Sequence, residues 1–389
     1  QKRIGQIFEC QFSKRSQICK VFASNPIDGS DFIQTTTVRY LYGTALLSLP
    51  NSLYFVCGGY TKYADFSNPC SFIDLKTRGL DEEDLKYSLR ALNTIDRNII
   101  NPFLHIYNWE SQGVILGISR CFPTDVQKCQ IRVTKIESIG GYKISFDRYM
   151  DIQWSRKVYL PNRGVACGNI IEKQPTCVFS TADDSSLRGM LFLYKFDFTT
   201  PDAEINPWGV VIDSRWPILS NFGDSIIVLD LNGDGYDDVI VSLPDADVNG
   251  KYRNGMVLLF INQKTTPFIT NNAISLVGDP VDFAHFGFGL ADAGDLNEDG
   301  NLDFFVSTLK SNNDGRAVIY AYLGAKDIVE DSYTYFEKII SQHGSSSQVG
   351  FGFKMFVGVD FNKDGTRDLF VSNIYRGEVE VYLYLFFLI

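Results

Sequence analysis

The chain has 389 residues, of which 45% are hydrophobic and 21% are charged, so it can bury a large core. Its formal net charge is −10 at pH 7. Nucleic-acid binding needs clustered Lys and Arg, so this acidic balance argues against nucleic acid as a partner.

The chain begins with Gln1, followed by Lys and Arg, without an initiator Met or the apolar core of a secretory signal. We therefore expect a processed or partial chain. The apolar tail Val379–Ile389 contains Glu380 and is too short to span a bilayer, so we expect no membrane contact by this fragment.

Eight cysteines fall into four close pairs along the chain. The pairs are Cys10 with Cys19, Cys57 with Cys70, Cys121 with Cys129, and Cys167 with Cys177. An even count in tight pairs predicts four local disulfides and an oxidising compartment. Free buried thiols or a zinc site are the alternatives. Zinc is disfavoured because His105, His285 and His343 are far apart in the sequence.

One segment of the first half has helical periodicity. Leu85, Leu89 and Leu92 share a face behind Asp81, which is a candidate N-cap. We expect a helix over Asp81–Ile99, on a connection between sheets.

The segment before the second half of the chain has no cluster of carboxylates. Cys167 and Cys177 bracket it, and the strand pattern aligns Cys177 with Asp238 of the next unit. We infer that a disulfide closes this loop where a bound metal closes the loops that follow.

A 65-residue repeat organises the second half. Its copies start at Asp230 (DLNGDGYDDVIVSLP), Asp295 (DLNEDGNLDFFVSTL) and Asp360 (DFNKDGTRDLFVSN). A Phe-Gly pair precedes each copy, and a glycine-led strand pattern follows it. Short β-branched or aromatic runs bounded by Gly, Asn and Asp predict strands. Each unit is then a four-stranded antiparallel sheet that must stack on its neighbours to bury both faces.

The glycine-led strand allows the sheets to be counted. Its glycine stands at Gly5, Gly189, Gly255, Gly315 and Gly377, and two degenerate copies are expected near Cys70 and Gln130. The sequence therefore predicts an all-β, seven-bladed β-propeller with an incomplete first blade. The whole chain, 1–389, would form one domain with a remnant of blade 1 at 1–25 and blades 2 to 7 at 26–80, 81–140, 141–200, 201–265, 266–325 and 326–389.

Each repeat carries a loop of the pattern D-x-N-x-D-G-x-x-D. Oxygen donors at positions 1, 3, 5, 7 and 9 suit Ca²⁺, and the glycine at position 6 permits a sharp turn. The expected ligands are Asp230, Asn232, Asp234, Tyr236 (carbonyl) and Asp238; Asp295, Asn297, Asp299, Asn301 (carbonyl) and Asp303; and Asp360, Asn362, Asp364, Thr366 (carbonyl) and Asp368. We expect three Ca²⁺ sites, with the oxygens of each loop converging on one point.

Two other interpretations of these loops are disfavoured. An EF-hand needs Glu at position 12, where this chain has Val241, Val306 and Val371. Plain Asp/Asn/Gly turns without metal remain the alternative, but three copies at one fixed period favour calcium.

The Phe-Gly pair, the acidic loop and the following strand, repeated three times, resemble the FG-GAP repeats of integrin α subunits. The front half adds support: GQIFECQFSKRSQIC from Gly5 is similar to the first-blade hairpin of these proteins, and the segments around Cys57 and Cys70 are similar to the second blade. The chain departs from the family's Gly-Ala-Pro, for example at 242–244 and 307–309.

The resemblance implies the calcium-stabilised head of an integrin-α-like cell adhesion receptor, the extracellular part of a single-pass plasma-membrane protein without enzymatic activity. Its partners would be an integrin β-like subunit and an extracellular-matrix or cell-surface protein ligand. Aromatic candidates for partner contact are Tyr42, Tyr60, Phe222, Phe286 and Phe351, and the alternative for each is packing between blades. Asp245 and Asp247 join them because they lie in a loop expected opposite the calcium hairpins.

Two other functions are the alternatives. A secreted or cell-surface FG-GAP propeller could bind carbohydrate or protein without a β subunit. An enzyme is disfavoured, because hydrolytic chemistry needs a metal cluster or an acid/base pair that the scattered histidines and the adjacent acids do not provide.

Overall fold

The structure is a computed structural model of the chain. Its description covers the side chains of residues 164–171, 176–180, 189–195, 217–264, 273–312, 315–329, 333–340, 350–357, 367–373 and 379–382, together with the backbone of further strands, including nine before residue 154. The chain forms two compact units. The first comprises residues 1–158 and 198–205, and the second comprises 159–197 and 206–389.

The strands of the first unit form antiparallel sheets in which neighbours in sequence are neighbours in space. The sheets are β1 (Gln6–Ser13) with β2 (Ser16–Ser24); β3 (Leu41–Leu49), β4 (Leu53–Gly59) and β5 (Cys70–Asp74); and β6 (Leu104–Trp109), β7 (Gly113–Cys121), β8 (Cys129–Ile136) and β9 (Tyr149–Gln153). The strands expected near Cys70 and Gln130 are β5 and β8.

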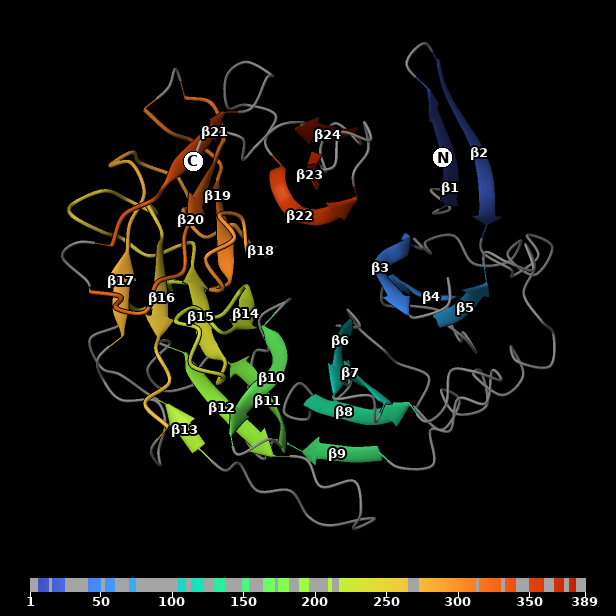
Figure 1. Ribbon diagram of the computed structural model, residues 1–389, viewed down its shortest axis with the longest axis horizontal. Helices are drawn as coiled ribbons and strands as arrows, with labels where there is room; N and C mark the ends of the chain where they lie inside the picture. The colour runs from blue at the N-terminus through green and yellow to red at the C-terminus, as the bar shows by residue number, and fades with distance from the viewer. Residues whose placement is uncertain are drawn as a thin grey trace. The chain divides into compact units, whose positions relative to one another are not determined.

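The second unit contains four antiparallel sheets (Figure 1). They are β10 (Val165–Ile171), β11 (Gln174–Thr181), β12 (Met190–Lys195) and β13 (Gly209–Val211); β14 (Ile226–Leu229), β15 (Asp238–Leu243), β16 (Met256–Phe260) and β17 (Ile274–Leu276); β18 (Gly289–Gly294), β19 (Asp303–Thr308), β20 (Val318–Tyr322) and β21 (Glu337–Ile340); and β22 (Phe351–Val359), β23 (Asp368–Asn373) and β24 (Glu378–Tyr382).

The four sheets stack in sequence order, and hydrophobic layers fill the spaces between them. In β15, Val239 and Val241 belong to the layer toward the preceding sheet, whereas Ile240 belongs to the layer toward the next. Side chains alternate in the same way in β19, where Phe304 and Phe305 enter different layers. Both faces of these central strands are therefore buried, which is the blade packing of a β-propeller.

The all-β fold is confirmed, and no helix is found among the described residues. The expected helix over Asp81–Ile99 lies outside them, and the blade count of seven stays a prediction. The sheets are offset from the expected blade ranges. The glycine-led strand is the third strand of β10–β13, β14–β17 and β18–β21, so a fourth strand extends each sheet into the next predicted range.

A glycine–serine contact joins successive sheets of the second unit. Ser180 Oγ donates a hydrogen bond to the carbonyl of Gly223 (2.8 Å), and Ser307 Oγ donates to the carbonyl of Gly352 (2.9 Å). A Cβ on Gly223 or Gly352 would lie 2.1 or 2.4 Å from the serine Cβ, and both glycines have φ near +75°, at 73° and 78°. The glycine of the Phe-Gly pair is therefore required by both space and backbone conformation.

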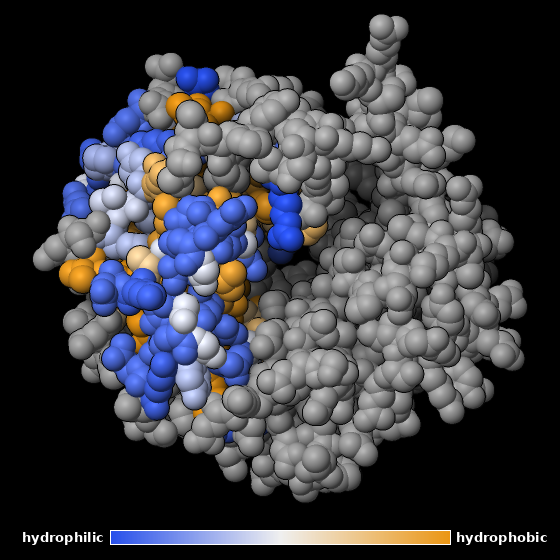
Figure 2. Space-filling view, viewed as in Figure 1, coloured by the Kyte–Doolittle hydropathy of each residue, from blue (hydrophilic) through white to orange (hydrophobic). Residues whose placement is uncertain are grey.

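The surface of the described sheets is mixed. On the face drawn in Figure 2, hydrophilic side chains dominate the coloured area and hydrophobic ones appear between them. A search of the described residues finds no helix with the length and hydropathy needed to cross a membrane.

Candidate metal centre

The first predicted calcium loop connects β14 to β15 and folds around its own acidic side chains. The two carboxylate oxygens of Asp230 accept hydrogen bonds from the N–H groups of Asp234 (3.0 Å) and Gly235 (2.8 Å). Asn232 Oδ1 accepts from the N–H of Asp234 (3.2 Å), and Asp234 Oδ1 accepts from that of Tyr236 (2.9 Å). Gly235 makes the turn with φ of +84°, which L side chains rarely adopt.

The second loop, between β18 and β19, repeats this pattern position by position. Asp295 accepts from the N–H groups of Asp299 (3.0 Å) and Gly300 (2.9 Å), and Asp299 Oδ1 accepts from that of Asn301 (2.8 Å). Gly300 has φ of +91°. The two loops share one hydrogen-bonding pattern, as their shared sequence predicts.

The aspartate at position 9 is buried in both loops and held by two backbone N–H groups. Asp238 accepts from Leu231 (3.0 Å) within the loop and from Asn262 (2.7 Å) after β16. Asp303 accepts in the same way, from Leu296 at 2.6 Å and Gly324 at 2.7 Å. These aspartates tie the loop to the end of the third strand of its sheet.

The electrostatics of both loops favour a cation. Burial, together with the negative charges of Asp230 and Asp234, raises the pKa of Asp238 to about 7 despite its two N–H donors. Burial likewise raises the pKa of Asp303 to about 6, with added repulsion from the carboxylates of the same loop. A divalent cation would offset this crowding of negative charge.

A lysine contacts the first loop. The Lys264 ammonium lies 3.3 Å from Asp234 Oδ2 and 3.4 Å from the Asp234 carbonyl, and 5.1 Å from the centre of the Tyr236 ring. The side chain is 45% exposed, so this is a surface ion pair. The D-x-N-x-D pattern gave no indication of this contact, because Lys264 lies on the far side of β16 in sequence.

The donor types fit Ca²⁺, because every expected ligand offers a hard oxygen. Among the described residues, no group of three or more His, Cys, Asp or Glu side chains is arranged to hold a metal. The carboxylates turn instead to the N–H groups of their own loop. In the third loop, the described ligand is Asp368, which is buried, and Asp360, Asn362, Asp364 and Thr366 lie outside the described residues.

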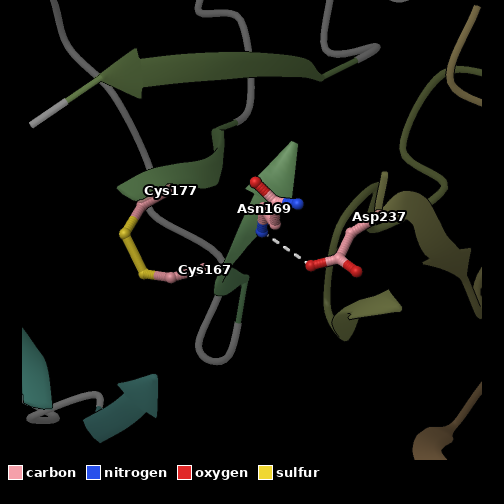
Figure 3. Close-up of a disulfide and its surroundings, with 4 residues drawn as sticks. All are labelled: Cys167, Asn169, Cys177 and Asp237. Carbon is pink, nitrogen blue, oxygen red and sulfur yellow. Dashed lines mark hydrogen bonds between the residues drawn. A yellow bond between two sulfur atoms is a disulfide. The ribbon is translucent and has the colours of Figure 1, made fainter. Parts of the chain in front are cut away.

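The hairpin between β10 and β11 carries a disulfide in place of an acidic loop. Cys167 and Cys177 are opposite each other in the ladder and are joined covalently (Figure 3). The sequence alignment was wrong by one residue, however. Ser180 contacts Gly223 in the same way as Ser242 contacts Gly287, so Ser180 and Ser242 are equivalent positions. Four residues before each of them, Thr176 is therefore equivalent to Asp238. Cys177 is equivalent to the valine that follows Asp238.

The other predicted cysteine pairs are also opposite each other in the strand ladders. The Cα partners are Cys10 with Cys19, Cys57 with Cys70, and Cys121 with Cys129. Their side chains lie outside the description, so these three disulfides stay predictions.

Three of the aromatic candidates for partner contact are buried. Phe222, Phe286 and Phe351 are at most 4% exposed and lie in the hydrophobic layers between sheets. These three side chains are therefore packed between sheets, as in the alternative to partner contact, and their rings are not accessible to a partner. The side chains of Tyr42 and Tyr60 are not among those described.

The two acidic candidates for partner contact, Asp245 and Asp247, form contacts within the chain. Asp245 Oδ1 pairs with His285 Nδ1 at 2.9 Å, and Asp247 Oδ1 accepts from the N–H of Arg253 at 2.7 Å. Both contacts stabilise the loop between β15 and β16, so the carboxylates are already engaged within the chain.

Sequence reasoning missed an exposed aromatic pair at this end of the sheets. Tyr252 is 50% exposed and Phe283 is 45% exposed, and their rings meet edge to face at 5.1 Å. Arg253 lies over the Tyr252 ring and Lys310 over the Phe283 ring, at 5.5 and 5.6 Å. Tyr252, Phe283 and Lys310 lie on three different connections between strands, so only the fold brings them together.

Comparison with solved structures gives low similarity. An α-L-arabinofuranosidase from Lactobacillus brevis matches with a TM-score of 0.37 and 11% identity, over 73% of this chain and 89% of that one. A GH43 endo-arabinanase from Bacillus licheniformis matches with a TM-score of 0.31 and 13% identity, over 72% and 94%. At these scores no function is inferred from either enzyme.

Sequence comparison points to one family. Residues 222–260 match the FG-GAP repeat model. The chain is 33% identical over 174 residues to integrin alpha pat-2 of Caenorhabditis briggsae and 30% identical over 170 residues to human integrin alpha-8, covering 41% and 42% of this chain. These matches span only 14% and 16% of the relatives' lengths. The chain therefore contains an FG-GAP repeat and is similar to integrin α subunits over about two fifths of its length.

Proposed function

We propose that this chain is the calcium-stabilised, ligand- and partner-binding head of an integrin-α-like cell adhesion receptor. The main support is the pair of matched loops at Asp230–Asp238 and Asp295–Asp303, which share sequence, hydrogen bonding and crowded carboxylates. The first of these loops lies inside the segment that matches the FG-GAP model.

Calcium would be held by the side chains at positions 1, 3, 5 and 9 and by the carbonyl at position 7. When bound, the ion supplies positive charge and a cross-link within each hairpin. The chain's own part is to fix the loop backbone, which the N–H contacts of Asp230 and Asp295 do in this structure. The third loop is proposed by its sequence.

The role of the metal in this proposal is structural, and recognition takes place elsewhere on the sheets. Loops that carry function on a rigid scaffold are commonly those free of structural duty. The aromatic pair Tyr252 and Phe283 lies on connections other than the calcium hairpins and is exposed, so it is a better candidate for partner contact than the buried phenylalanines. The partners would be an integrin β-like subunit and an extracellular protein ligand, and no catalysis is assigned.

Calorimetric titration of the chelator-treated protein with CaCl₂ tests the metal sites. We expect three sites, and we expect Asp234→Ala and Asp299→Ala to abolish one site each. Asp282→Asn serves as a control, because it changes an exposed acid that accepts from the N–H of Tyr252 and keeps an acceptor there. Calcium uptake of zero in the folded parent protein would overturn the proposal.

Co-expression with an integrin β-subunit ectodomain tests the partner. Co-elution as a stable heterodimer is expected, and Tyr252→Ala with Phe283→Ala should weaken it. Tight binding of a glycan or protein ligand by the chain alone, with no heterodimer formed, would instead support a propeller that works without a β subunit.

A further inference from the structure

Asn169 of the disulfide hairpin makes three hydrogen bonds to the first calcium loop. Its N–H donates to Asp237 Oδ2 (2.6 Å), its carbonyl accepts from the N–H of Asp237 (3.1 Å), and its Nδ2 donates to the carbonyl of Gly235 (2.9 Å). Figure 3 shows Asn169 and Asp237 facing each other beside the Cys167–Cys177 bond. Asn169 thus belongs to one sheet and binds the loop of the next.

The two residues that Asn169 binds lie on either side of Tyr236. The carbonyl of Tyr236 is the expected ligand at position 7, and Asp237, at position 8, is not an expected ligand. Fixing Gly235 and Asp237 therefore sets the orientation of the peptide group that would face the metal. Gly168 makes room for this contact, because a Cβ there would lie 2.4 Å from Asp237 Oδ2.

The β10–β11 ladder does not hold Asn169 directly. The regular pairing stops after Gly168, opposite Thr176, and resumes at Ile171, opposite Gln174. Asn169 lies in this irregular stretch, with its N–H and carbonyl directed to Asp237 of the next sheet. The chain on either side of Asn169 is held, by the buried disulfide at Cys167 two residues earlier and by Asn262, whose Nδ2 donates to the carbonyl of Ile170 at 2.8 Å.

The second loop is supported differently. Its position 8 is Leu302, whose N–H donates to the carbonyl of Asp230 in the first loop at 3.1 Å. Asn169 therefore occupies, in the disulfide hairpin, the place that Asp230 occupies in the first loop. Of the two described loops, only the first is hydrogen-bonded to a preceding hairpin that has no acidic ligands.

From this geometry we propose that Asn169 is a positioning residue for the first calcium loop and that the Cys167–Cys177 disulfide holds Asn169 in place. The affinity of the first loop for calcium then depends on a covalent bond in the neighbouring sheet, whereas that of the second loop does not. This inference rests on the proposed calcium function.

Terbium luminescence provides a site-specific readout in the intact chain. Tyr236 lies within the first loop, so the part of the tyrosine-sensitised Tb³⁺ emission that Tyr236→Phe removes reports on this loop. Tyr333, whose hydroxyl donates to the carbonyl of Leu323 next to the Gly324 N–H that binds Asp303, lies near the second loop and can sensitise an ion there. Calorimetry with CaCl₂ then follows the remaining sites.

Three variants test the proposal. Asn169→Ala removes the side-chain donor, Asp237→Leu introduces the residue type found at position 8 of the second loop, and the double variant Cys167→Ala/Cys177→Ala removes the disulfide. Each should raise the Tb³⁺ concentration for half-saturation of the first loop about five- to tenfold, with calcium binding at the second loop changed less than twofold. Asn312→Ala, in the β19–β20 loop, is the matched control and should leave both unchanged.

The outcomes separate this inference from the proposed function. If the parent protein binds no Tb³⁺ or Ca²⁺, both fail. If the parent binds but Asn169→Ala and Asp237→Leu bind Tb³⁺ as tightly, the positioning role is overturned. If those two weaken binding while the folded cysteine variant does not, the role of the disulfide is overturned. Should the cysteine variant not fold, Asn169→Ala and Asp237→Leu still decide the positioning role, because both keep the disulfide.

Discussion

The β10–β11 hairpin and the β14–β15 hairpin occupy the same place in neighbouring sheets, and each is closed by different chemistry. In the first, Cys167 and Cys177 form a covalent link across the ladder. In the second, Asp230, Asp234 and Asp238 accept hydrogen bonds from backbone N–H groups of their own short loop. The flanking strands are alike, so the two hairpins differ in how the turn is stabilised: by a covalent bond in the first and by the contacts of an acidic loop in the second.

The two hairpins differ in whether their contribution to stability depends on the calcium concentration. A disulfide across a short loop contributes about 2–3 kcal/mol whatever the cation concentration. A calcium loop contributes an amount that grows with the ratio of free calcium to its dissociation constant. If the acidic loops bind calcium as proposed, the second unit combines one hairpin of fixed stability with hairpins whose stability depends on the calcium concentration.

Chelation should separate the two kinds of hairpin most strongly. If free calcium is a hundredfold above the dissociation constant, each site adds about 2.7 kcal/mol, so EDTA should lower the free energy of unfolding by about 5 kcal/mol for the two described loops. Hydrogen exchange should show faster exchange at the N–H groups of Asp234, Gly235, Asp299 and Gly300, with a smaller change along β11. Equal acceleration in both hairpins would contradict the distinction.

Loss of the serine hydroxyl between sheets should affect both regions equally. Ser180→Ala and Ser307→Ala each leave a buried glycine carbonyl without its donor, so each should cost about 1–2 kcal/mol in urea unfolding. The cost should be the same with calcium and with EDTA, since this contact involves no loop ligand. Ser225→Ala is a control expected within about 0.5 kcal/mol of the parent. A calcium-dependent cost at Ser307 alone would show that the two regions differ beyond their hairpins.

The smallest expected effect concerns Lys264. Lys264→Ala removes an exposed cation from Asp234, so it should lower calcium-free stability by about 0.5 kcal/mol and raise calcium affinity at the first loop a few-fold. Lys326, at the equivalent position of the next sheet, supplies the control variant Lys326→Ala. Calorimetry at low and high salt is the measurement, because screening should shrink the difference. Unchanged affinity at low salt would show that the ammonium does not compete with the metal.

Much of the fold could be predicted because its signals are local. Alternating β-branched and aromatic runs between turn residues specify β15, β19 and β23, and the repeated acidic pattern specifies two loops of one conformation. The close cysteine pairs could be matched because each pair falls on adjacent strands of a ladder.

The features that could not be predicted from the sequence depend on contacts between distant segments. β13 and β17 have three residues each, too few for a pattern of their own, and they form by completing a sheet edge. The burial of Phe222 and Phe286 is decided by the neighbouring sheet, which no local pattern describes. The one-residue error at Cys177 arose because the register of β11 is fixed by contacts with other segments, such as that of Ser180 with Gly223.

The cross-sheet hydrogen bonds join hairpins that follow one another along the chain, which bears on how the chain is made. The N–H of Asp237 donates to the carbonyl of Asn169, and the N–H of Leu302 donates to the carbonyl of Asp230, so each of these hairpins binds the one that precedes it in the sequence. During synthesis on the ribosome, the earlier hairpin is available before the later one emerges. Assembly of the second unit can therefore proceed vectorially, with each new sheet packing on the face of a sheet that has already formed.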